Sequence, residues 1–204
     1  MGALLNQGLG PRSGVGFVGR CRHDHPVKRA RWVTALSGDG MSGRMTSAPD
    51  LSLYRPNVGV VLFNAQGQVW YGHRAGTEAS GNWQFPQGGV DKGEDLEAAA
   101  RRELYEETGV TSVEPLGRTE GWIVYDFPVG FGGSKQARGF SGQKQVWFAY
   151  RFTGEESEID LEAHGEVEFD AWRWGDLSEA CDLIVPFKRE AYAQVAQAFA
   201  HLAA

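Results

Sequence analysis

The stretch GGVDKGEDLEAAARRELYEETGV, residues 88–110, decides the fold of this chain. Glycines lie at both of its ends, as turns require, whereas residues 95–108 contain neither Gly nor Pro and are good or tolerable helix formers. The stretch therefore predicts a loop, a helix and a second loop. Because Leu96, Ala100 and Leu104 recur every fourth residue, one stripe of the helix is expected to pack against a core.

Three carboxylates, those of Glu103, Glu106 and Glu107, share one side of this helix, because spacings of three and four residues bring side chains together. Like charges held so close repel one another unless a cation neutralises them. Oxygen ligands suit a hard divalent ion, Mg²⁺ or Mn²⁺, better than zinc. The alternative is a solvent-exposed acidic face, which is the commoner meaning of clustered Glu. The glycine loops and the apolar stripe favour the metal site.

The same stretch resembles the motif of the Nudix hydrolases. Their pattern G-x5-E-x7-R-E-U-x-E-E-x-G-U, in which U is aliphatic, is matched at every specified position. The matching residues are Gly88, Glu94, Arg102, Glu103, Leu104, Glu106, Glu107, Gly109 and Val110. So many positions at fixed spacing form a far more specific signal than a short glycine motif.

This resemblance implies a fold and a reaction. The Nudix fold is an α/β/α sandwich around a mixed β-sheet, and the family hydrolyses nucleoside diphosphates linked to another group. The metal ligands that the resemblance implies are Glu103, Glu106, Glu107 and the backbone carbonyl of Gly88. It also implies that Glu94 and Arg102 brace the loop–helix–loop motif rather than touch the substrate.

Similarity beyond the motif covers residues 54–199 and narrows the resemblance to the RNA pyrophosphohydrolase subfamily, whose members are also described as dinucleoside polyphosphate hydrolases. It is carried by residues 54–59, 83–89, 142–145, 147–148, 168–170, 172–174 and 187–189. The activity implied is removal of pyrophosphate from 5′-triphosphorylated RNA by metal-dependent attack of water. Two alternatives stay open. One is hydrolysis of diadenosine tetra- or pentaphosphate with release of ATP, and the other is a catalytically inactive nucleotide-binding module.

The subfamily resemblance also assigns residues outside the motif. Glu168 is expected to complete the metal site, which makes Glu103, Glu107 and Glu168 the catalytic candidates, with Glu107 or Glu168 as general base. The expected substrate contacts are Arg55 and Lys188 on phosphates, Arg74 and Phe187 around the first bases, and Tyr125 and Lys144 along the phosphate channel. The loop between residues 74 and 83 is longer than in the enterobacterial type, which leaves the selectivity for the first nucleotides open.

The chain divides into two parts, an arm of residues 1–49 and a Nudix domain of residues 50–204. The arm carries seven Lys or Arg against two Asp, is rich in Gly, Ser and Arg, and is expected to be weakly ordered. Three explanations compete: a translation-start artefact, since Met45 stands just before the globular pattern; an organelle transit segment; or an arm that touches RNA. The first is favoured.

Residues 50–204 carry 13 basic against 24 acidic groups, so the broad basic stripe of a protein that grips long nucleic acid is excluded and an RNA is expected to be held by its end.

With neither a membrane-span-like run nor a signal peptide pattern, a cytoplasmic protein is expected. No obligate protein partner is expected. Strands are expected at residues 58–63, 68–73, 143–152 and 169–174, and more than one strand within residues 113–125, including residues 121–125. Residues 83–87 are expected to be a short extended piece, and an amphipathic helix is expected after Pro186. The acidic stretch 155–162 is expected to be a solvated loop.

Overall fold

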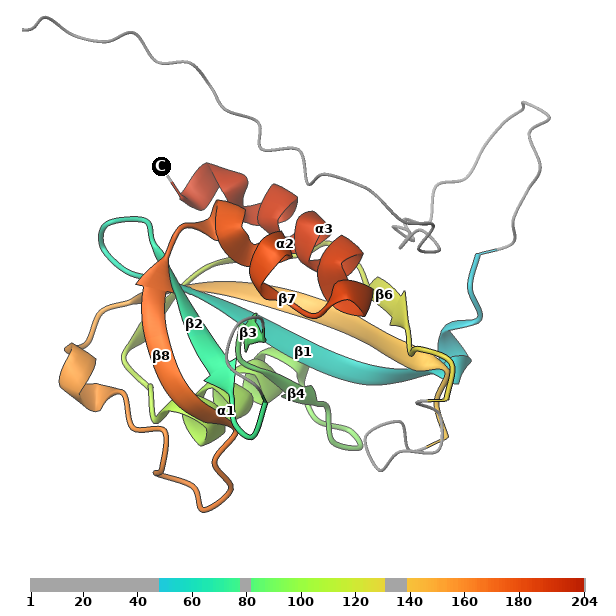
Figure 1. The fold of residues 1–204 in the computed structure, drawn as a ribbon, viewed down its shortest axis with the longest axis horizontal. Helices are drawn as coiled ribbons and strands as arrows, with labels where there is room; N and C mark the ends of the chain where they lie inside the picture. The colour runs from blue at the N-terminus through green and yellow to red at the C-terminus, as the bar shows by residue number, and fades with distance from the viewer. Residues whose placement is uncertain (1–47, 78–81, 131–138, 204) are drawn as a thin grey trace, which may run out of the picture.

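The computed structural model describes residues 48–77, 82–130 and 139–203. In this part of the chain one mixed sheet of eight strands carries α1 (Leu96–Thr108) on one face and α2 (Ala180–Leu183) and α3 (Arg189–Phe199) on the other (Figure 1). The predicted α/β/α sandwich is confirmed. The predicted arm lies outside the described residues, except for its last two positions, and so do parts of the loops after Arg74 and Gly130.

The strands are β1 (Tyr54–Phe63), β2 (Val69–Arg74), β3 (Trp83–Gln84), β4 (Gln87–Gly89), β5 (Val113–Arg118), β6 (Ile123–Asp126), β7 (Gly142–Phe152) and β8 (Phe169–Gly175). Short 3₁₀ turns include η1 (Leu51–Leu53), η3 (Glu156–Glu158), η4 (Leu177–Glu179) and η5 (Pro186–Lys188).

The sheet is built on the parallel pair of β1 and β7, whose register places Val58 beside Val146. The other edge of β1 is shared between two antiparallel partners. Its first half pairs with β4, with Val58 opposite Gly88, and its end at Phe63 pairs with β2. β2 pairs in turn with β3 and β8, whereas β4 ends after three residues. The two partners of β1 therefore diverge, and the polar residues described below lie around the point where they separate.

Two separate cores, one on each face of the sheet, explain the continuous apolar runs of the central strands. Side chains alternate along a strand, so Val60 of β1 packs into the core under α1 whereas Val61 packs into the core under α3. The core under α3 contains packed aromatic rings: the rings of Phe85 and Tyr192 stack at 5.2 Å, and the Trp147 ring meets Tyr192 at 5.5 Å.

The motif helix α1 has the predicted length and local stop signals. Asp95 caps it by accepting hydrogen bonds from the backbone N–H groups of Glu97 and Ala98, at 2.9 and 3.1 Å. It ends at Gly109, whose φ of 73° lies in the left-handed region that favours glycine. The predicted stripe is buried at Ala100 and Leu104, which anchors the helix on the sheet.

The structure differs from the sequence predictions in three elements. The expected strands of residues 113–125 are β5 and β6, but the second begins at Ile123 and not at Gly121, and α2 is a four-residue helix that was not predicted. The acidic stretch 155–162 is not merely solvated. Glu158 accepts hydrogen bonds from the N–H groups of Thr111 and Ser112, at 2.6 and 2.9 Å, and Asp160 N–H donates to Thr108 at 2.9 Å. The stretch therefore braces the end of α1.

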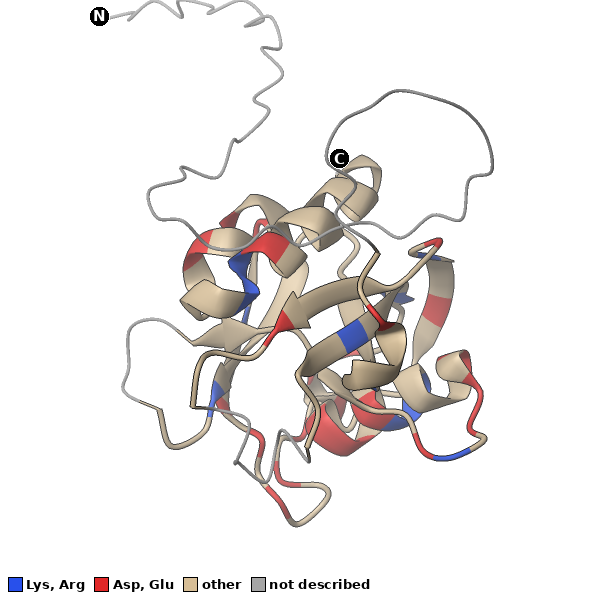
Figure 2. Ribbon diagram, turned by 90° about the vertical axis from the view of Figure 1, so that its right-hand side faces the viewer, with Lys and Arg blue, Asp and Glu red and all other residues tan. Residues whose placement is uncertain are grey.

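Charge is distributed as the composition predicts. Carboxylate-bearing segments are spread over the described ribbon, whereas Lys and Arg segments are few and scattered (Figure 2). None of the helices in the described part of the chain combines the length and the apolar character that a membrane span requires.

Candidate active site

The edge strand β4 ties the motif helix to the sheet through its outward-facing backbone. Hydrogen bonds from Val60 N–H to Pro86 (2.8 Å) and from Val90 N–H to Pro56 (3.2 Å) bracket the Val58–Gly88 pair. In an antiparallel ladder the residues on either side of such a pair direct their polar groups away from the partner strand. Two side chains of α1 take these groups. Gln87 N–H donates to Glu107 Oε2 at 3.0 Å, and the carbonyl of Gly89 accepts from Arg102 Nη2 at 2.8 Å.

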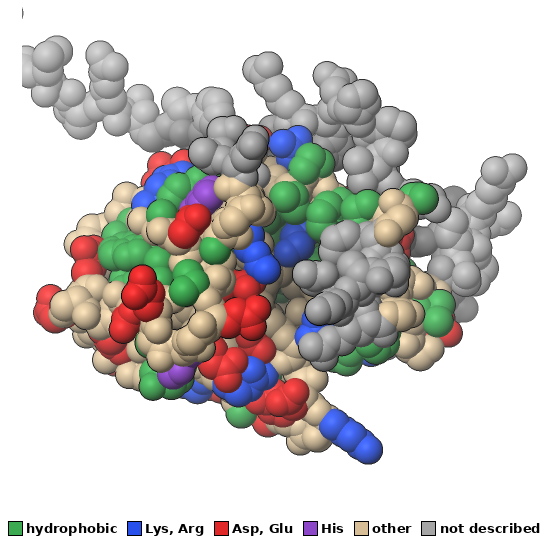
Figure 3. All heavy atoms as spheres, turned by 60° about the horizontal axis from the view of Figure 1, so that its bottom comes forward, with side chains coloured by type: hydrophobic (Ala, Val, Ile, Leu, Met, Phe, Trp, Pro, Cys, Tyr) green, Lys and Arg blue, Asp and Glu red, His purple; other side chains and the backbone are tan. Residues whose placement is uncertain are grey.

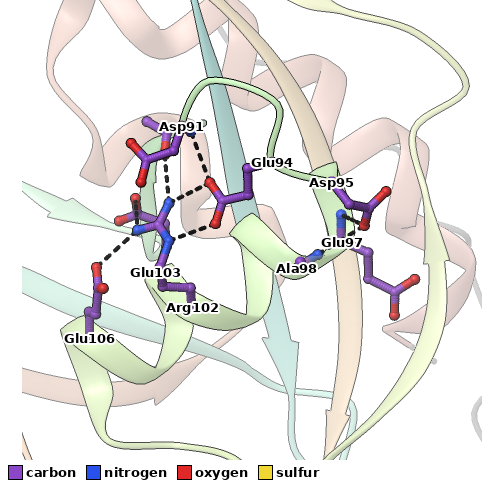
Figure 4. Close-up of polar contacts among 9 residues, drawn as sticks. Asp91, Glu94, Asp95, Glu97, Ala98, Arg102, Glu103 and Glu106 are labelled. Carbon is purple, nitrogen blue, oxygen red and sulfur yellow. Dashed lines mark hydrogen bonds and ion pairs between the residues drawn. The ribbon is translucent and has the colours of Figure 1, made fainter.

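Arg102 is the hub of the motif (Figure 4). Its Nε and Nη2 donate to the two oxygens of Glu94, at 2.8 and 3.0 Å, in the bidentate geometry that suits a guanidinium. Its Nη1 donates to Glu103 Oε1 at 2.8 Å and to Glu106 Oε2 at 3.0 Å. The Arg102 hydrogen bonds, followed by the backbone bond of Asp91, lower the pKa of Glu94 to about 2. One cation thus joins the loop to the helix.

Two glycines allow charged side chains to pack directly on β4. A Cβ at Gly88 would lie 1.8 to 2.3 Å from the carboxylate atoms of Glu103, and a Cβ at Gly89 would lie 2.4 Å from Nη2 of Arg55. Both approaches are far shorter than the 3.4 to 4 Å of ordinary contact. A residue with a side chain at either position would displace the charged group, so the Gly-Gly pair sets how closely Glu103 and Arg55 approach the strand.

Glu103 and Glu107 are acids in a desolvated position. The side chain of Glu103 is only 12% exposed, and burial raises its pKa against the opposing effect of Arg102. Burial raises the pKa of Glu107 well above its usual range, and the neighbouring charge of Glu103 raises it further, while the Gln87 N–H lowers it. Two acids that disfavour each other's ionisation in a buried place favour a bound cation.

Glu168 approaches the site from the start of β8. Its carboxylate contacts the guanidinium of Arg74 at the end of β2, and its backbone carbonyl accepts from Ala75 N–H at 2.9 Å. The Arg74 charge also acts on Glu107 and lowers the pKa of that acid. Arg74 therefore lies near both Glu107 of α1 and Glu168, the residue before β8.

The turn η5 supplies the other side of the site. Lys188 Nζ lies 5.8 Å from the ring centroid of Tyr125, and the rings of Phe187 and Tyr125 are 5.9 Å apart. Burial, and then the charge of Arg74, lower the pKa of Lys188 to about 8, against the opposing effect of Glu107. A half-buried ammonium beside a guanidinium marks a place that favours an anion.

Lys144 is the expected substrate contact that the structure does not bring to this group. Its Nζ donates to the carbonyl of Leu51 at 3.0 Å and lies 5.3 Å from the ring centroid of Trp122. In the β6–β7 ladder Val124 pairs with Lys144 and Tyr125 with Gln143. Because neighbouring residues of a strand face opposite sides of the sheet, Lys144 and Tyr125 lie on opposite sides.

The donor set fits a hard divalent cation by chemistry rather than by preformed geometry. Within residues 48–77, 82–130 and 139–203 no three His, Cys, Asp or Glu side chains converge as a metal cluster. Glu103 and Glu106 instead converge on Arg102, and Glu168 meets Arg74. All candidate donors are nevertheless oxygens, and two of them belong to half-buried acids that pack against β4. Figure 3 shows a face on which acidic and basic side chains lie side by side around a hollow.

Sequence reasoning missed two groups that hold the site. Gln87 supplies the N–H that binds Glu107, although the motif specifies no residue at this position. Tyr192 of α3 accepts hydrogen bonds from Phe85 N–H and from Gln87 Nε2, both at 3.1 Å. An aromatic residue in an amphipathic helix gave no signal beyond core packing.

The fold and the site define a Nudix hydrolase. The NUDIX domain model matches residues 53–195, and the chain belongs to this family, whose hydrolases generally use divalent metal cations. The chain is also similar to individual members of the family. An RNA pyrophosphohydrolase of Caulobacter vibrioides (strain NA1000 / CB15N) is 69% identical over 147 residues, which cover 72% of this chain and 86% of that protein. An RNA pyrophosphohydrolase of Bradyrhizobium sp. (strain ORS 278) is 49% identical over 167 residues, 78% of this chain and 99% of that one.

A solved structure agrees at the level of the fold. The dihydroneopterin triphosphate pyrophosphohydrolase of E. coli superposes with a TM-score of 0.53 at 21% identity, and the match covers 71% of this chain and 98% of that one.

Proposed function

We propose that this protein removes pyrophosphate from the 5′ end of triphosphorylated RNA and leaves a 5′-monophosphate. The observation that carries the substrate is the 69% identity to a protein named RNA pyrophosphohydrolase, over 86% of that protein's length. The proposal places the enzyme in the cytoplasm, where transcripts are the substrate.

The proposed cofactor is Mg²⁺ or Mn²⁺, held by Glu103, Glu106, Glu107, Glu168 and the carbonyl of Gly88. Such a cation, when bound, neutralises polyphosphate charge, polarises phosphoryl oxygens and lowers the pKa of water. The oxygen donors and the buried acids support this choice. Arg102 holds Glu103 and Glu106 next to each other.

Glu107 is the proposed general base. Its Oε2 holds the Gln87 N–H, which leaves Oε1 to accept a proton from the attacking water. Glu168 is the second candidate for this role, and its contact with Arg74 makes it the more strongly neutralised of the two.

Positive groups around the acids are proposed to bind the polyphosphate. Arg55 of β1, which packs beside Gly89, and the half-buried Lys188 are the phosphate contacts, since only fixed cations satisfy the oxygens that metal ions leave. Arg74 and Phe187 are proposed to hold the first bases, and Tyr125 supports Phe187 by ring contact. Lys144 is left out of the phosphate contacts, because its ammonium is bound to Leu51 on the other side of the sheet.

The alternative substrate is a dinucleoside polyphosphate, such as diadenosine tetraphosphate. The excess of acidic over basic groups in residues 50–204 favours a small substrate held by the same phosphate contacts. An inactive nucleotide-binding module would require loss of motif carboxylates, and Glu103, Glu106 and Glu107 are all present.

The test identifies the products that the enzyme releases from RNA. With 5′-triphosphorylated RNA and Mg²⁺ or Mn²⁺, pyrophosphate and 5′-monophosphate RNA should appear together, and the substitution E107Q should lower kcat by roughly 10²–10⁴-fold at unchanged stability. The substitution E97Q is the matched control on the exposed start of α1 and should leave kcat unchanged. Release of orthophosphate in place of pyrophosphate, or near-normal turnover by E107Q, would refute the assignment.

A further inference from the structure

A chain of amide side chains, with the half-buried Gln87 and Gln143 on either side of the buried Gln145 of β7, runs from the site into the core under α3. Gln145 Nε2 donates to Gln87 Oε1 at 2.9 Å and to Gln143 Oε1 at 3.3 Å. Gln143 Oε1 also accepts from Tyr125 Oη at 2.5 Å, and at the other end Gln87 Nε2 donates to Tyr192 Oη at 3.1 Å. The chain thus joins β4, β6, β7 and α3.

The amide of Gln145 destabilises the fold at this position. It is completely buried, and among the described residues its Oε1 has no hydrogen-bond partner. Its neighbour across the β1–β7 ladder, Asn57, is also buried with an unpartnered Oδ1, so it gives no evidence of a compensating bond. A buried carbonyl without a partner costs free energy that an apolar side chain of similar size would avoid. Fold stability therefore does not explain the amide.

The bonds that Gln145 makes lead to the catalytic acid. Gln87 lies in β4, a strand of only three residues, and its backbone N–H donates to Glu107 Oε2 at 3.0 Å. The ladder holds one end of this peptide, since the carbonyl of Pro86 accepts from Val60 N–H at 2.8 Å. The Gln87 side chain is held from both ends as well, by Gln145 and by Tyr192. These side-chain bonds fix Gln87 on the other side of the N–H that meets Glu107.

We propose that Gln145 is a positioning residue, which holds Gln87 so that the Gln87 N–H fixes the carboxylate of Glu107. The inference rests on the proposed function, in which Glu107 takes part in catalysis. Gln145 is itself buried, and within the described part of the chain the hydrogen bonds of its side chain go to Gln87 and Gln143.

The test is a double-mutant cycle on the full chain with triphosphorylated RNA. Gln145→Leu should lower kcat by about 10–100-fold, as loss of a hydrogen bond behind a catalytic ligand does. KM should stay within about twofold, since the phosphate contacts are untouched. Gln87→Leu should act alike, and the double variant should be no worse than the poorer single variant. The melting temperature of Gln145→Leu should stay close to that of the parent, because removal of a buried unpartnered oxygen offsets the loss of the two hydrogen bonds that the amide donates.

Gln194→Leu is the matched control. Gln194 is a buried amide of α3 whose Oε1 also lacks a partner within the described residues, and its substitution should leave kcat unchanged. The inference is overturned if Gln145→Leu keeps full kcat, if its effect multiplies with that of Gln87→Leu, or if its lost activity follows a lowered melting temperature. Gln145→Met replaces it in the cycle should the leucine variant not fold.

Parallel measurement of E107Q distinguishes failure of this inference from failure of the proposed role of Glu107. An inactive E107Q beside a fully active Gln145→Leu overturns this inference alone. An active E107Q overturns the assignment of Glu107 and this inference with it.

Discussion

Replacing Gly88 by alanine should separate catalysis from folding. Gly88 has no positive φ, so the backbone accepts alanine, but the new Cβ would lie 1.8 Å from one carboxylate oxygen of Glu103. Ordinary contact begins at 3.4 Å, so this carboxylate must retreat by about 1.5 Å. Arg102 holds the same side chain at 2.8 Å on the other side, and only 12% of it is exposed. A displacement of about 1 Å at a catalytic centre costs roughly 10²-fold in rate.

The assay measures pyrophosphate release from triphosphorylated RNA as a function of Mg²⁺ concentration, together with urea unfolding. G88A should lose kcat by roughly 10²-fold and need more Mg²⁺, with a free energy of unfolding within about 1 kcal/mol of the parent. G89A is the matched control, because its Cβ meets the end of the long Arg55 side chain and should raise KM more than it lowers kcat. Full kcat in G88A, or the same loss in both variants, would show that the packing of Glu103 on Gly88 does not matter for catalysis.

Three further predictions follow from single contacts. E94Q should reduce the free energy of unfolding by about 1 kcal/mol at pH 7, since its bidentate pair with Arg102 is partly screened by solvent. The pKa of Glu94 is about 2 in the folded protein, which is below its value in the unfolded chain. The difference in unfolding free energy between E94Q and the parent should therefore be full above pH 5 and shrink as the pH falls toward 2. A difference that does not change with pH would contradict the ion pair between Glu94 and Arg102. The pKa of Lys188 is about 8, so kcat/KM on RNA should fall as the pH rises through 8 and the ammonium loses its proton. K188R should remove this fall, because arginine keeps its charge at that pH. The same fall in K188R would exclude Lys188 as its origin. E158Q should lower the free energy of unfolding by about 1 kcal/mol in the same assay, because its carboxylate accepts from the N–H groups of Thr111 and Ser112, and an unchanged value would show that the brace at the end of α1 contributes nothing.

The motif helix could be predicted from the sequence because its determinants are local. Asp95 at its start, Gly109 at its end and the stripe at Ala100 and Leu104 all act within one segment. The sandwich followed in the same way from apolar runs that alternate with turn residues. Family resemblance then supplied the candidate ligands, whose roles stay a prediction.

The remaining features depend on pairing between distant segments. The N–H of Gln87 faces Glu107 only because β4 pairs with β1 in one register, and no local pattern encodes that register. Lys144 lies away from Tyr125 because each strand residue faces one side of the sheet, which the sequence alone does not assign to a site. The bracing by Glu158 joins segments 46 residues apart, so its acid stretch resembled an ordinary solvated loop.

The central claim is the substrate, and a direct comparison of kcat/KM for 5′-triphosphorylated RNA and diadenosine tetraphosphate tests it most closely. Both substrates should be measured with the same enzyme preparation, in Mg²⁺ and in Mn²⁺, with E107Q as the background. A higher kcat/KM for the RNA, with pyrophosphate as the product, is expected. A higher kcat/KM for diadenosine tetraphosphate in both metals, with little pyrophosphate released from RNA, would contradict the claim and make the dinucleotide the substrate.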